Sequence, residues 1–271
     1  QGFLRSLRYV VIDEAHRYRG VFGAHVASVL RRLRRLCRHY GADPVFISAS
    51  GTIAEPARHL ERLAGVYDAL AVERDSCTRP ALDFVVWQAA ADPHREAAAM
   101  LTRLVDNGYQ ALAFTTSRTQ AELVADQARR HCIDPDGIAS YRAGYLANDR
   151  RELEAALSTG RLRGVACTNA LELGVDITGM DAVLSIGFPG SLAALWQQAG
   201  RAGRDGRDAF AMLIARPDPL DTWLCDHPEA LFESPIEATV LHPQQPAVLS
   251  AHLAAAAQEL ALTSGDEQFF G

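Results

Sequence analysis

Short apolar runs rich in β-branched residues alternate with longer stretches of helical periodicity along most of this chain. The run at 7–12 reads LRYVVI and the run at 45–48 reads VFIS. Between them, apolar residues recur at the spacing of a helix. Such alternation is typical of a parallel sheet covered by helices on both faces. The sequence therefore predicts an α/β fold built on parallel sheets.

A more complete series of alternating elements begins near residue 82. Right-handed crossovers would stack the helices of this series on both faces of one sheet. The expected strands are 82–87, 111–116, 138–141, 164–168, 182–188 and 209–215. The expected helices are about 93–107, 118–132, 149–159 and 191–202.

These patterns divide the chain into three parts. Residues 1–75 supply only two strands and two or three helices, too few to close such a sheet, whereas residues 76–215 contain a whole α/β domain. Residues 216–271 are rich in proline and lead to an Ala-rich helix around 247–262. This last part is expected to be a connector followed by the start of an appended, mostly helical region.

Composition excludes several classes of function. A net charge of -6 argues against a generally basic nucleic-acid coat, although a local basic groove stays possible. The apolar runs are far shorter than the roughly 18 residues that span a bilayer, so we expect no membrane partner. The 5 cysteines are far apart and form no C-x-x-C, which predicts reduced thiols in a cytoplasmic protein. All 27 basic residues are arginine, so these residues cannot supply the lysine of a Walker A phosphate loop.

A cluster of arginines lies in the helix expected between the first two strands. Val26, Leu30 and Leu33 mark the apolar side of this helix, and the arginines fall mostly on the other side. We interpret the arginine face as solvated, with a contact to nucleic acid as the alternative. The arginines are Arg31, Arg32, Arg34, Arg35 and Arg38.

The first strand ends in D-E-A-H, residues 13–16. Open α/β sheets place their ligands at the carboxyl ends of strands. Asp13 could there hold Mg²⁺ through water, and Glu14 could orient and deprotonate the water that attacks a γ-phosphate. A plain surface turn is the alternative. The second strand ends in S-A-S-G-T, residues 48–52, whose hydroxyls could bond the acidic tip or simply form a turn.

Two further motifs lie in the second domain. Residues 197–204 read QQAGRAGR, in which Arg201 and Arg204 are expected to share one helical face and form an anion clamp. Residues 168–176 read TNALELGVD and begin at a strand tip. The hydroxyl of Thr168 suits a nucleic-acid phosphate, while Asp176 could face the nucleotide.

Taken in this order, D-E-A-H and Q-Q-A-G-R-A-G-R resemble the motifs of the superfamily 2 DExH-box helicases over about residues 7–215. The segments YRGVFGAHV (18–26), ALELGVDI (170–177) and WQQAGR (196–201) are similar to those of the Hrq/MrfA-type DNA-repair helicases. Trp223 and the H-P-E at 227–229 fit the same group. The resemblance implies the back half of a first RecA-like domain and the whole of a second. It also implies an ATP- and Mg²⁺-dependent enzyme that moves 3′-to-5′ on single-stranded DNA, with an RNA helicase as the alternative.

The resemblance also assigns roles to single residues. Asp13 would hold Mg²⁺ through water, Glu14 would be the catalytic base, and the arginines of the last motif would reach the γ-phosphate. The catalytic set is Asp13, Glu14, His16, Gln197, Arg201 and Arg204. The set that couples hydrolysis to movement is Ser48, Ser50, Thr52, Gly174 and Asp176. The set that touches the nucleic-acid backbone is Ser117, Arg118, Gly144 and Thr168.

Two departures from the family pattern qualify this expectation. The family usually has S-A-T where this chain has S-A-S-G-T, which leaves open which hydroxyl takes the coupling role. The phosphate loop and its lysine precede D-E-A-H in the family and are absent from these 271 residues. We therefore expect a fragment that needs the upstream half of the first motor domain to bind ATP and is inactive alone. For the isolated chain, a non-catalytic nucleic-acid-binding module is the alternative.

Overall fold

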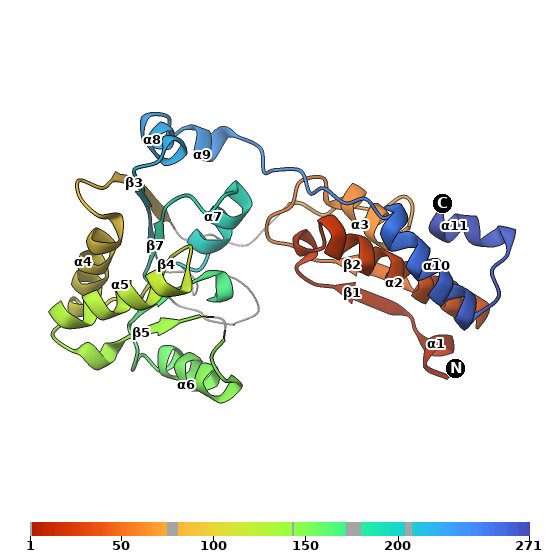
Figure 1. Ribbon diagram of the computed structural model, residues 1–271, viewed down its shortest axis with the longest axis horizontal. Helices are drawn as coiled ribbons and strands as arrows, with labels where there is room; N and C mark the ends of the chain where they lie inside the picture. The colour runs from red at the N-terminus through yellow and green to blue at the C-terminus, as the bar shows by residue number, and fades with distance from the viewer. Residues whose placement is uncertain (1, 75–80, 143, 172–179, 204–207) are drawn as a thin grey trace. The chain divides into compact units, whose positions relative to one another are not determined.

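The computed structural model describes residues 2–74, 81–142, 144–171, 180–203 and 208–271. The chain forms two compact units: unit 1 comprises residues 1–75 with 236–271, and unit 2 comprises residues 76–235 (Figure 1). The segment 216–271, which the sequence suggested as a connector followed by the start of an appended region, is divided between the two units after residue 235.

Unit 1 is built on two parallel strands, β1 (Tyr9–Ile12) and β2 (Val45–Ser48), paired with Ile12 opposite Ser48. Two helices follow the strands, α2 (Gly20–His39) after β1 and α3 (Pro56–Ala64) after β2. Alternate strand residues point to opposite faces. Ile12 and Phe46 are buried in a core with residues of α2 and α3. The residues of the other face are exposed, and they are Tyr9, Val11, Val45 and Ile47.

Residues 236–271 return to unit 1 and pack against α2. This segment contains α10 (Pro246–Glu259), a short 3-10 turn (Ser264–Asp266) and α11 (Glu267–Phe270). Leu241 is buried in the core beneath α2 and α3, and Gly20 N donates to Val240 O at 2.8 Å. Gly23 is required here, because a Cβ would lie 2.5 Å from the backbone C and O of Tyr18. A short helix, α1 (Gly2–Ser6), precedes β1.

The interpretation of the arginine face of α2 as solvated is wrong. Arg31 and Arg35 are buried, with 8% and 2% of their surface exposed. Arg31 donates to the carbonyls of Arg62 at 2.7 Å and Leu63 at 3.0 Å, which end α3. Arginines at a helix C-terminus satisfy carbonyls that lack partners within the helix and interact favourably with its dipole. Burial lowers the pKa of Arg31 to about 10.

Arg35 makes the same kind of contact with α10. Its guanidinium donates to the carbonyls of Ala256, Leu260 and Ala261 at 2.8 to 3.0 Å, and its Nε donates to Asp266 Oδ1 at 2.7 Å. Three further contacts join the arginines to neighbouring segments: Arg32 with Glu259, Arg38 with Gln268, and Arg34 with the Gly65 carbonyl. The arginine face of α2 therefore holds α3 and the returning segment in place.

Unit 2 contains a six-stranded parallel sheet in the order β3-β8-β7-β4-β6-β5. All six strands lie where the sequence pattern predicts them. They are β3 (Leu82–Gln88), β4 (Ala111–Phe114), β5 (Ile138–Tyr141), β6 (Gly164–Cys167), β7 (Ala182–Ile186) and β8 (Ala209–Ala215). The helices are α4 (Pro93–Asp106), α5 (Arg118–His131), α6 (Ala147–Ser158), α7 (Leu192–Ala199), α8 (Pro219–Asp226) and α9 (Ala230–Glu233). Short 3-10 turns occur at Pro135–Gly137 and Asn169–Leu171.

Both faces of the sheet are buried at its central strands β4, β6 and β7, as the mostly apolar character of these strands predicts. In β4, Ala111 and Ala113 face a core shared with α4 and α5. Leu112 and Phe114 face a second core that contains residues of α6. The sheet therefore carries helices on both sides (Figure 1).

The first part of the proline-rich segment is integrated into unit 2. Asp221 in α8 is fully buried and accepts hydrogen bonds from the backbone N of Phe188 and of Arg216, at 3.1 and 2.8 Å. Phe232 of α9 lies in an aromatic cluster with Phe84 of β3 and Trp196 of α7, with ring centroids 5.3 to 5.6 Å apart. The described part of the chain contains no helix long and apolar enough to cross a membrane.

Candidate functional site

The D-E-A-H turn lies at the carboxyl end of β1, directly beside the end of β2. Glu14 has φ 50° and ψ 48°, a left-handed conformation that is uncommon outside glycine. Its backbone N donates to Asp13 Oδ1 at 2.8 Å. Ala15 N donates to Ala49 O at 3.0 Å, which ties the turn to the chain leaving β2. Backbone strain of this kind costs on the order of 1–3 kcal/mol and persists where surrounding contacts hold it.

His16 connects this turn to the S-A-S-G-T segment. Its Nδ1 lies 2.9 Å from Ser50 Oγ and 3.5 Å from Glu14 Oε2. Burial lowers the pKa of His16. The sequence suggested that a hydroxyl would bond the carboxylates, whereas the observed hydroxyl partner is the imidazole. Ser48 pairs with Ile12 in the sheet, and Thr52 is partly exposed.

Asp13 has the chemistry that a water-mediated Mg²⁺ contact requires. It is exposed and directly follows β1, and the Glu14 amide fixes one of its carboxylate oxygens. Within the described residues, no group of three or more His, Cys, Asp and Glu side chains converges on a possible metal position. A hard cation with most of its ligands from water and phosphate needs only one such carboxylate. The residues present therefore fit a magnesium ion held through water.

In unit 2, the expected backbone-binding residues follow three adjacent strands, β4, β6 and β5. Ser117 caps α5, its Oγ accepting from Gln120 N at 3.2 Å, and Arg118 is the first residue of that helix. Thr168 directly follows β6 and is 7% exposed. Gly144 lies after β5 with φ +106°, a conformation that favours glycine. The structure thus places Ser117, Arg118, Gly144 and Thr168 at the carboxyl ends of neighbouring strands, which we call the nucleic-acid edge of the sheet.

Arg142 belongs to the same place, although sequence reasoning missed it. A Cβ at Gly144 would lie 3.5 Å from Arg142 Nη1 and 3.6 Å from Arg118 Nη1, so two guanidinium groups flank this glycine. Arg142 Nε donates to Glu122 Oε1 at 2.6 Å, and its Cζ lies 4.8 Å from the centroid of the Tyr145 ring. The bond to Glu122 raises the pKa of Arg142. Its position directly after β5 is the signal that could have identified it.

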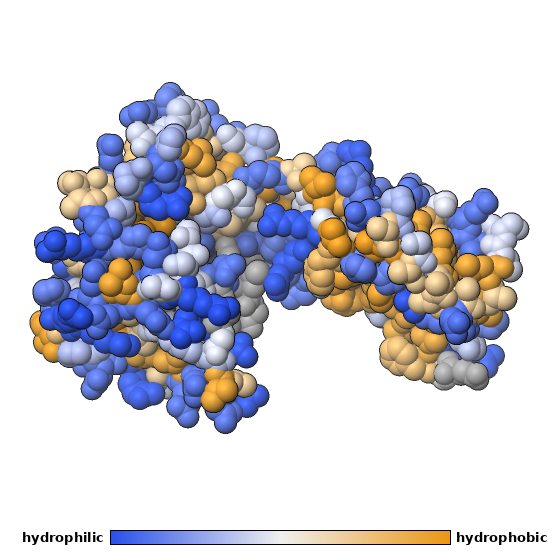
Figure 2. All heavy atoms as spheres, viewed as in Figure 1, coloured by the Kyte–Doolittle hydropathy of each residue, from blue (hydrophilic) through white to orange (hydrophobic). Residues whose placement is uncertain are grey.

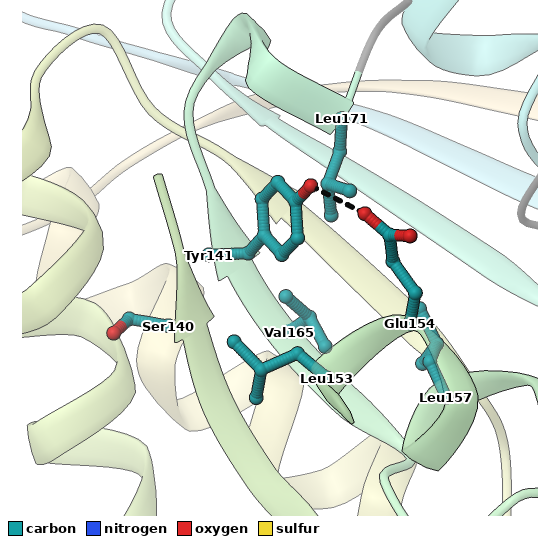
Figure 3. Close-up of a pocket in the computed structure, with 7 residues that line it drawn as sticks. All are labelled: Ser140, Tyr141, Leu153, Glu154, Leu157, Val165 and Leu171. Carbon is teal, nitrogen blue, oxygen red and sulfur yellow. Dashed lines mark hydrogen bonds between the residues drawn. The ribbon is translucent and has the colours of Figure 1, made fainter. Parts of the chain in front are cut away.

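A small cavity behind β5 and β6 does not extend this site (Figure 3). Tyr141 turns toward α6, where its hydroxyl donates to Glu154 Oε1 at 2.7 Å, and Ser140 points to the other side of the strand. The cavity has a volume of about 10 Å³, enough for at most one water. Burial raises the pKa of Tyr141 to about 12. The Tyr141–Glu154 bond therefore anchors β5 to α6, just before Arg142 and Gly144.

The Q-Q-A-G-R-A-G-R segment begins on α7 and then leaves it. The helix ends at Ala199, Gly200 follows as its C-cap, and Arg201 lies in a turn. The expectation that Arg201 sits on a helical face is therefore wrong, because the backbone leaves the helix at the first glycine. Arg201 is 7% exposed, and Gln197 is partly exposed. Gly174, Asp176 and Arg204 lie outside the described residues.

Gln198, which the sequence analysis did not single out, fixes α7 to the sheet. Its Oε1 accepts from Ser185 Oγ of β7 at 2.8 Å, and both residues are buried. Beyond the helix, Gly203 N donates to Met180 O at 3.0 Å. These contacts hold α7 and Gly203 beside β7 and the residues that lead into it.

Two units that carry a D-E-A-H turn and a Q-Q-A-G-R-A-G-R segment beside parallel sheets define a superfamily 2 helicase core. Family models agree: DEAD/DEAH box helicase matches residues 1–60, and helicase conserved C-terminal domain matches residues 96–206. The chain belongs to the Hrq/MrfA type of superfamily 2 helicases. It is similar to the following two relatives and to one solved structure.

The ATP-dependent helicase YprA of Bacillus subtilis is 40% identical over 276 residues, which cover 97% of this chain and 37% of YprA. The ATP-dependent helicase HRQ1 of Saccharomyces cerevisiae is 37% identical over 290 residues, which cover 99% of this chain and 27% of HRQ1. The crystal structure of the helicase MrfA bound to DNA and AMPPNP superimposes with a TM-score of 0.86 at 38% identity. That superposition covers 95% of this chain and 37% of MrfA. The chain thus spans only about a third of the length of the proteins it matches.

Proposed function

We propose that this chain is part of an ATP-dependent helicase that moves 3′-to-5′ along single-stranded DNA and acts in DNA repair. The observation that carries the proposal is the D-E-A-H turn at the end of β1, bonded through His16 to Ser50 at the end of β2. Glu14, the proposed base, lies in the turn after β1, and Ser50, the proposed coupling residue, follows β2. The two strands are neighbours in the sheet. The use of ATP and DNA is supported by the relative MrfA, which was crystallised with DNA and AMPPNP.

In this proposal, the turn acts on the γ-phosphate of ATP. Mg²⁺, held through water by Asp13, would neutralise charge on the phosphates. Glu14 accepts a proton from the attacking water, and its left-handed backbone holds the carboxylate beyond the end of the strand. A movement of the D-E-A-H turn displaces Ser50 through the hydrogen bond between His16 and Ser50. Gln197, Arg201 and Arg204 are the residues proposed to act on the γ-phosphate, and Gly174 and Asp176 are those proposed to take part in coupling.

The nucleic-acid strand is held by the edge of the unit 2 sheet. Arg118 and Arg142 flank Gly144 and supply positive charge, and Ser117 and Thr168 supply hydroxyls. Contacts of this kind go to phosphates and do not read bases. Single-stranded DNA is the proposed substrate because the MrfA structure contains DNA.

The phosphate loop is proposed to lie outside these 271 residues. The chain contains no lysine, and a bound triphosphate needs the loop's lysine and backbone amides. The exposed face of β1 and β2 supports this, because it carries Tyr9, Val11, Val45 and Ile47. Figure 2 shows apolar surface over this part of unit 1. An apolar sheet face of this kind is where the upstream half of the first motor domain would pack.

ATP turnover with single-stranded DNA, with single-stranded RNA and without nucleic acid tests the proposal. The full-length protein is expected to hydrolyse ATP faster with DNA, and its Glu14→Gln variant is expected to be inactive. The 271-residue chain alone is expected to be inactive under all three conditions. Stimulation by RNA alone would indicate an RNA helicase instead. A full-length protein that binds DNA without turnover would indicate a non-catalytic binding module.

A further inference from the structure

The left-handed turn at Glu14 needs to be held from both sides. Two backbone amides of the turn donate hydrogen bonds: Glu14 N to Asp13 Oδ1, and Ala15 N to Ala49 O. Among the side chains of the turn, the imidazole of His16 forms a hydrogen bond with the hydroxyl of Ser50. The carbonyl of Ala15, a residue that is 2% exposed, lies at the centre of the turn and accepts a hydrogen bond from Tyr18 N at 3.1 Å. A carbonyl oxygen has two lone pairs, so this one can accept a second hydrogen bond.

His59 supplies that second hydrogen bond. It lies in the first turns of α3, is 4% exposed, and places Nε2 2.9 Å from Ala15 O. A carbonyl only accepts hydrogen bonds, so the proton must be on Nε2. Nδ1 of His59 is buried and has no hydrogen-bond partner among the described residues. The imidazole therefore makes a single directed bond, and it goes to the peptide between Glu14 and His16.

The charge state of His59 agrees with this geometry. Burial lowers its pKa, the hydrogen bond to Ala15 O opposes this, and the nearby charges of His16 and Arg62 act in the same direction as burial. The ring therefore stays neutral near pH 7, with one N–H to donate. Protonation would add a second donor at Nδ1 with no acceptor beside it, which the surrounding apolar residues of α3 disfavour.

We propose that His59 is a positioning residue, which holds Glu14 in its left-handed conformation by donating from Nε2 to the carbonyl of Ala15. This inference rests on the proposed function, since it assigns to α3 the task of orienting the catalytic base. His59 touches neither nucleotide nor attacking water. Its effect passes through one backbone bond, so a loss of that bond displaces the Glu14 carboxylate and leaves nucleotide affinity unchanged.

Three variants of the full-length protein separate the donor from the bulk of the ring. His59→Phe keeps the volume and removes the donor, and His59→Gln places an amide N–H near the position of Nε2. His39→Phe is the matched control, because His39 is exposed at the end of α2. His59→Phe is expected to lower kcat by about 10- to 100-fold with KM for ATP changed less than about 2-fold, the size expected from a misplaced reacting group. His59→Gln is expected to restore most of kcat.

Two kinetic results would overturn the proposal. One is full kcat in His59→Phe, and the other is an equal loss of kcat in His59→Gln, which would make ring packing the cause. A second measurement does not depend on activity. In the 271-residue chain, the ¹⁵N shifts of the His59 ring are expected to show a proton on Nε2 and none on Nδ1 at pH 7. The opposite tautomer would refute the bond even if the helicase assignment holds, whereas failure of the helicase assignment alone would leave this spectrum unchanged.

Discussion

The imidazole of His16 and the hydroxyl of Ser50 lie 2.9 Å apart, from Nδ1 to Oγ, although 34 positions separate them in the sequence. The bond joins the turn after β1 to the turn after β2. Of the hydroxyls in S-A-S-G-T, Ser50 is therefore the one that we expect to couple hydrolysis to movement. In the full-length protein, Ser50→Ala should lower the DNA unwound per ATP hydrolysed by about 2- to 10-fold, the value of one hydrogen bond. Ser48→Ala is the matched control, and an equal loss in that variant would contradict the assignment.

The second prediction concerns Glu14. Replacing it with glutamine preserves the shape of the side chain and removes the base, so turnover should fall by about 10²- to 10⁴-fold. The Kd for ATP should be unchanged, because the carboxylate acts on the attacking water. Stopped-flow binding of a fluorescent ATP analogue, measured beside steady-state hydrolysis, checks both values. A parallel loss of affinity would identify Glu14 as a structural residue.

The third prediction concerns the buried contact between Arg35 and Asp266. Arg35→Met should destabilise unit 1 by about 3–5 kcal/mol, because Asp266 and the end of α10 lose their donor. Arg32→Met removes a more exposed pair with Glu259 and should cost about 1 kcal/mol or less.

The chain provides its own internal control for this measurement. Its 3 tryptophans, Trp87, Trp196 and Trp223, all belong to unit 2. In urea, the far-UV circular dichroism transition of unit 1 should therefore shift in Arg35→Met, while the tryptophan fluorescence transition stays in place. A shift of both transitions would argue against the assignment of the contact to unit 1 alone.

The fourth prediction is a dependence of unit 1 on pH. Arg32 Nη1 lies 3.3 Å from His252 Nδ1, and His252 Nε2 lies 3.1 Å from His25 Nδ1. Arginine only donates, so His252 must be protonated on Nε2 and neutral. Burial, and after it the charges of Arg32 and His25, lower the pKa of His252 below 6.5, while Glu259 opposes them.

The sign of the effect follows from the two states. As pH falls through 6.5, the unfolded chain takes up a proton at His252 and the folded chain does not, so stability present above that pH is progressively lost below it. His252→Gln can still donate to His25 and does not titrate. Urea unfolding of unit 1 between pH 7.5 and 5.5 should therefore depend less steeply on pH in this variant. The same slope in both proteins would show that His252 is not responsible.

The fifth prediction tests the nucleic-acid edge of unit 2. Binding of the 271-residue chain to single-stranded DNA should weaken with salt, and Arg118→Ala and Arg142→Ala should each reduce the log–log slope by about 0.7. Arg130→Ala is the matched control, since Arg130 is exposed near the far end of the same helix as Arg118. Fluorescence anisotropy at several salt concentrations provides the slopes. An unchanged slope in both variants would remove this edge from the proposed contact.

The sequence predicts the central strands of unit 2 well because β4, β6 and β7 are short, fully buried, mostly apolar runs. Helix ends also fall close to their expected positions, as for α5, which was expected over 118–132 and spans Arg118–His131. Local pattern suffices for such elements, because burial on both faces of the sheet is visible in the residues themselves.

The environment of α2 was not predictable in the same way. The spacing of its arginines shows that they share a face, but the partners of Arg35 lie more than 200 positions away. Periodicity cannot distinguish a face covered by a distant segment from one covered by water. The left-handed backbone of Glu14 and the departure of Arg201 from α7 were missed for a related reason: both depend on contacts with neighbouring segments and glycines rather than on the pattern of apolar residues.

The division of unit 1 into two stretches of sequence has a consequence for synthesis on the ribosome. Residues 1–75 emerge before residues 76–235, and the segment that covers α2 follows only after all of residues 76–235. At about 5–20 residues per second, the delay lasts roughly 10 to 30 seconds. Unit 2, which is continuous in sequence, can fold during that interval. Nascent α2 meanwhile lacks the partners of Arg32, Arg35 and Arg38, so a chain released before residue 236 would leave these three arginines without the contacts that they make in the finished protein.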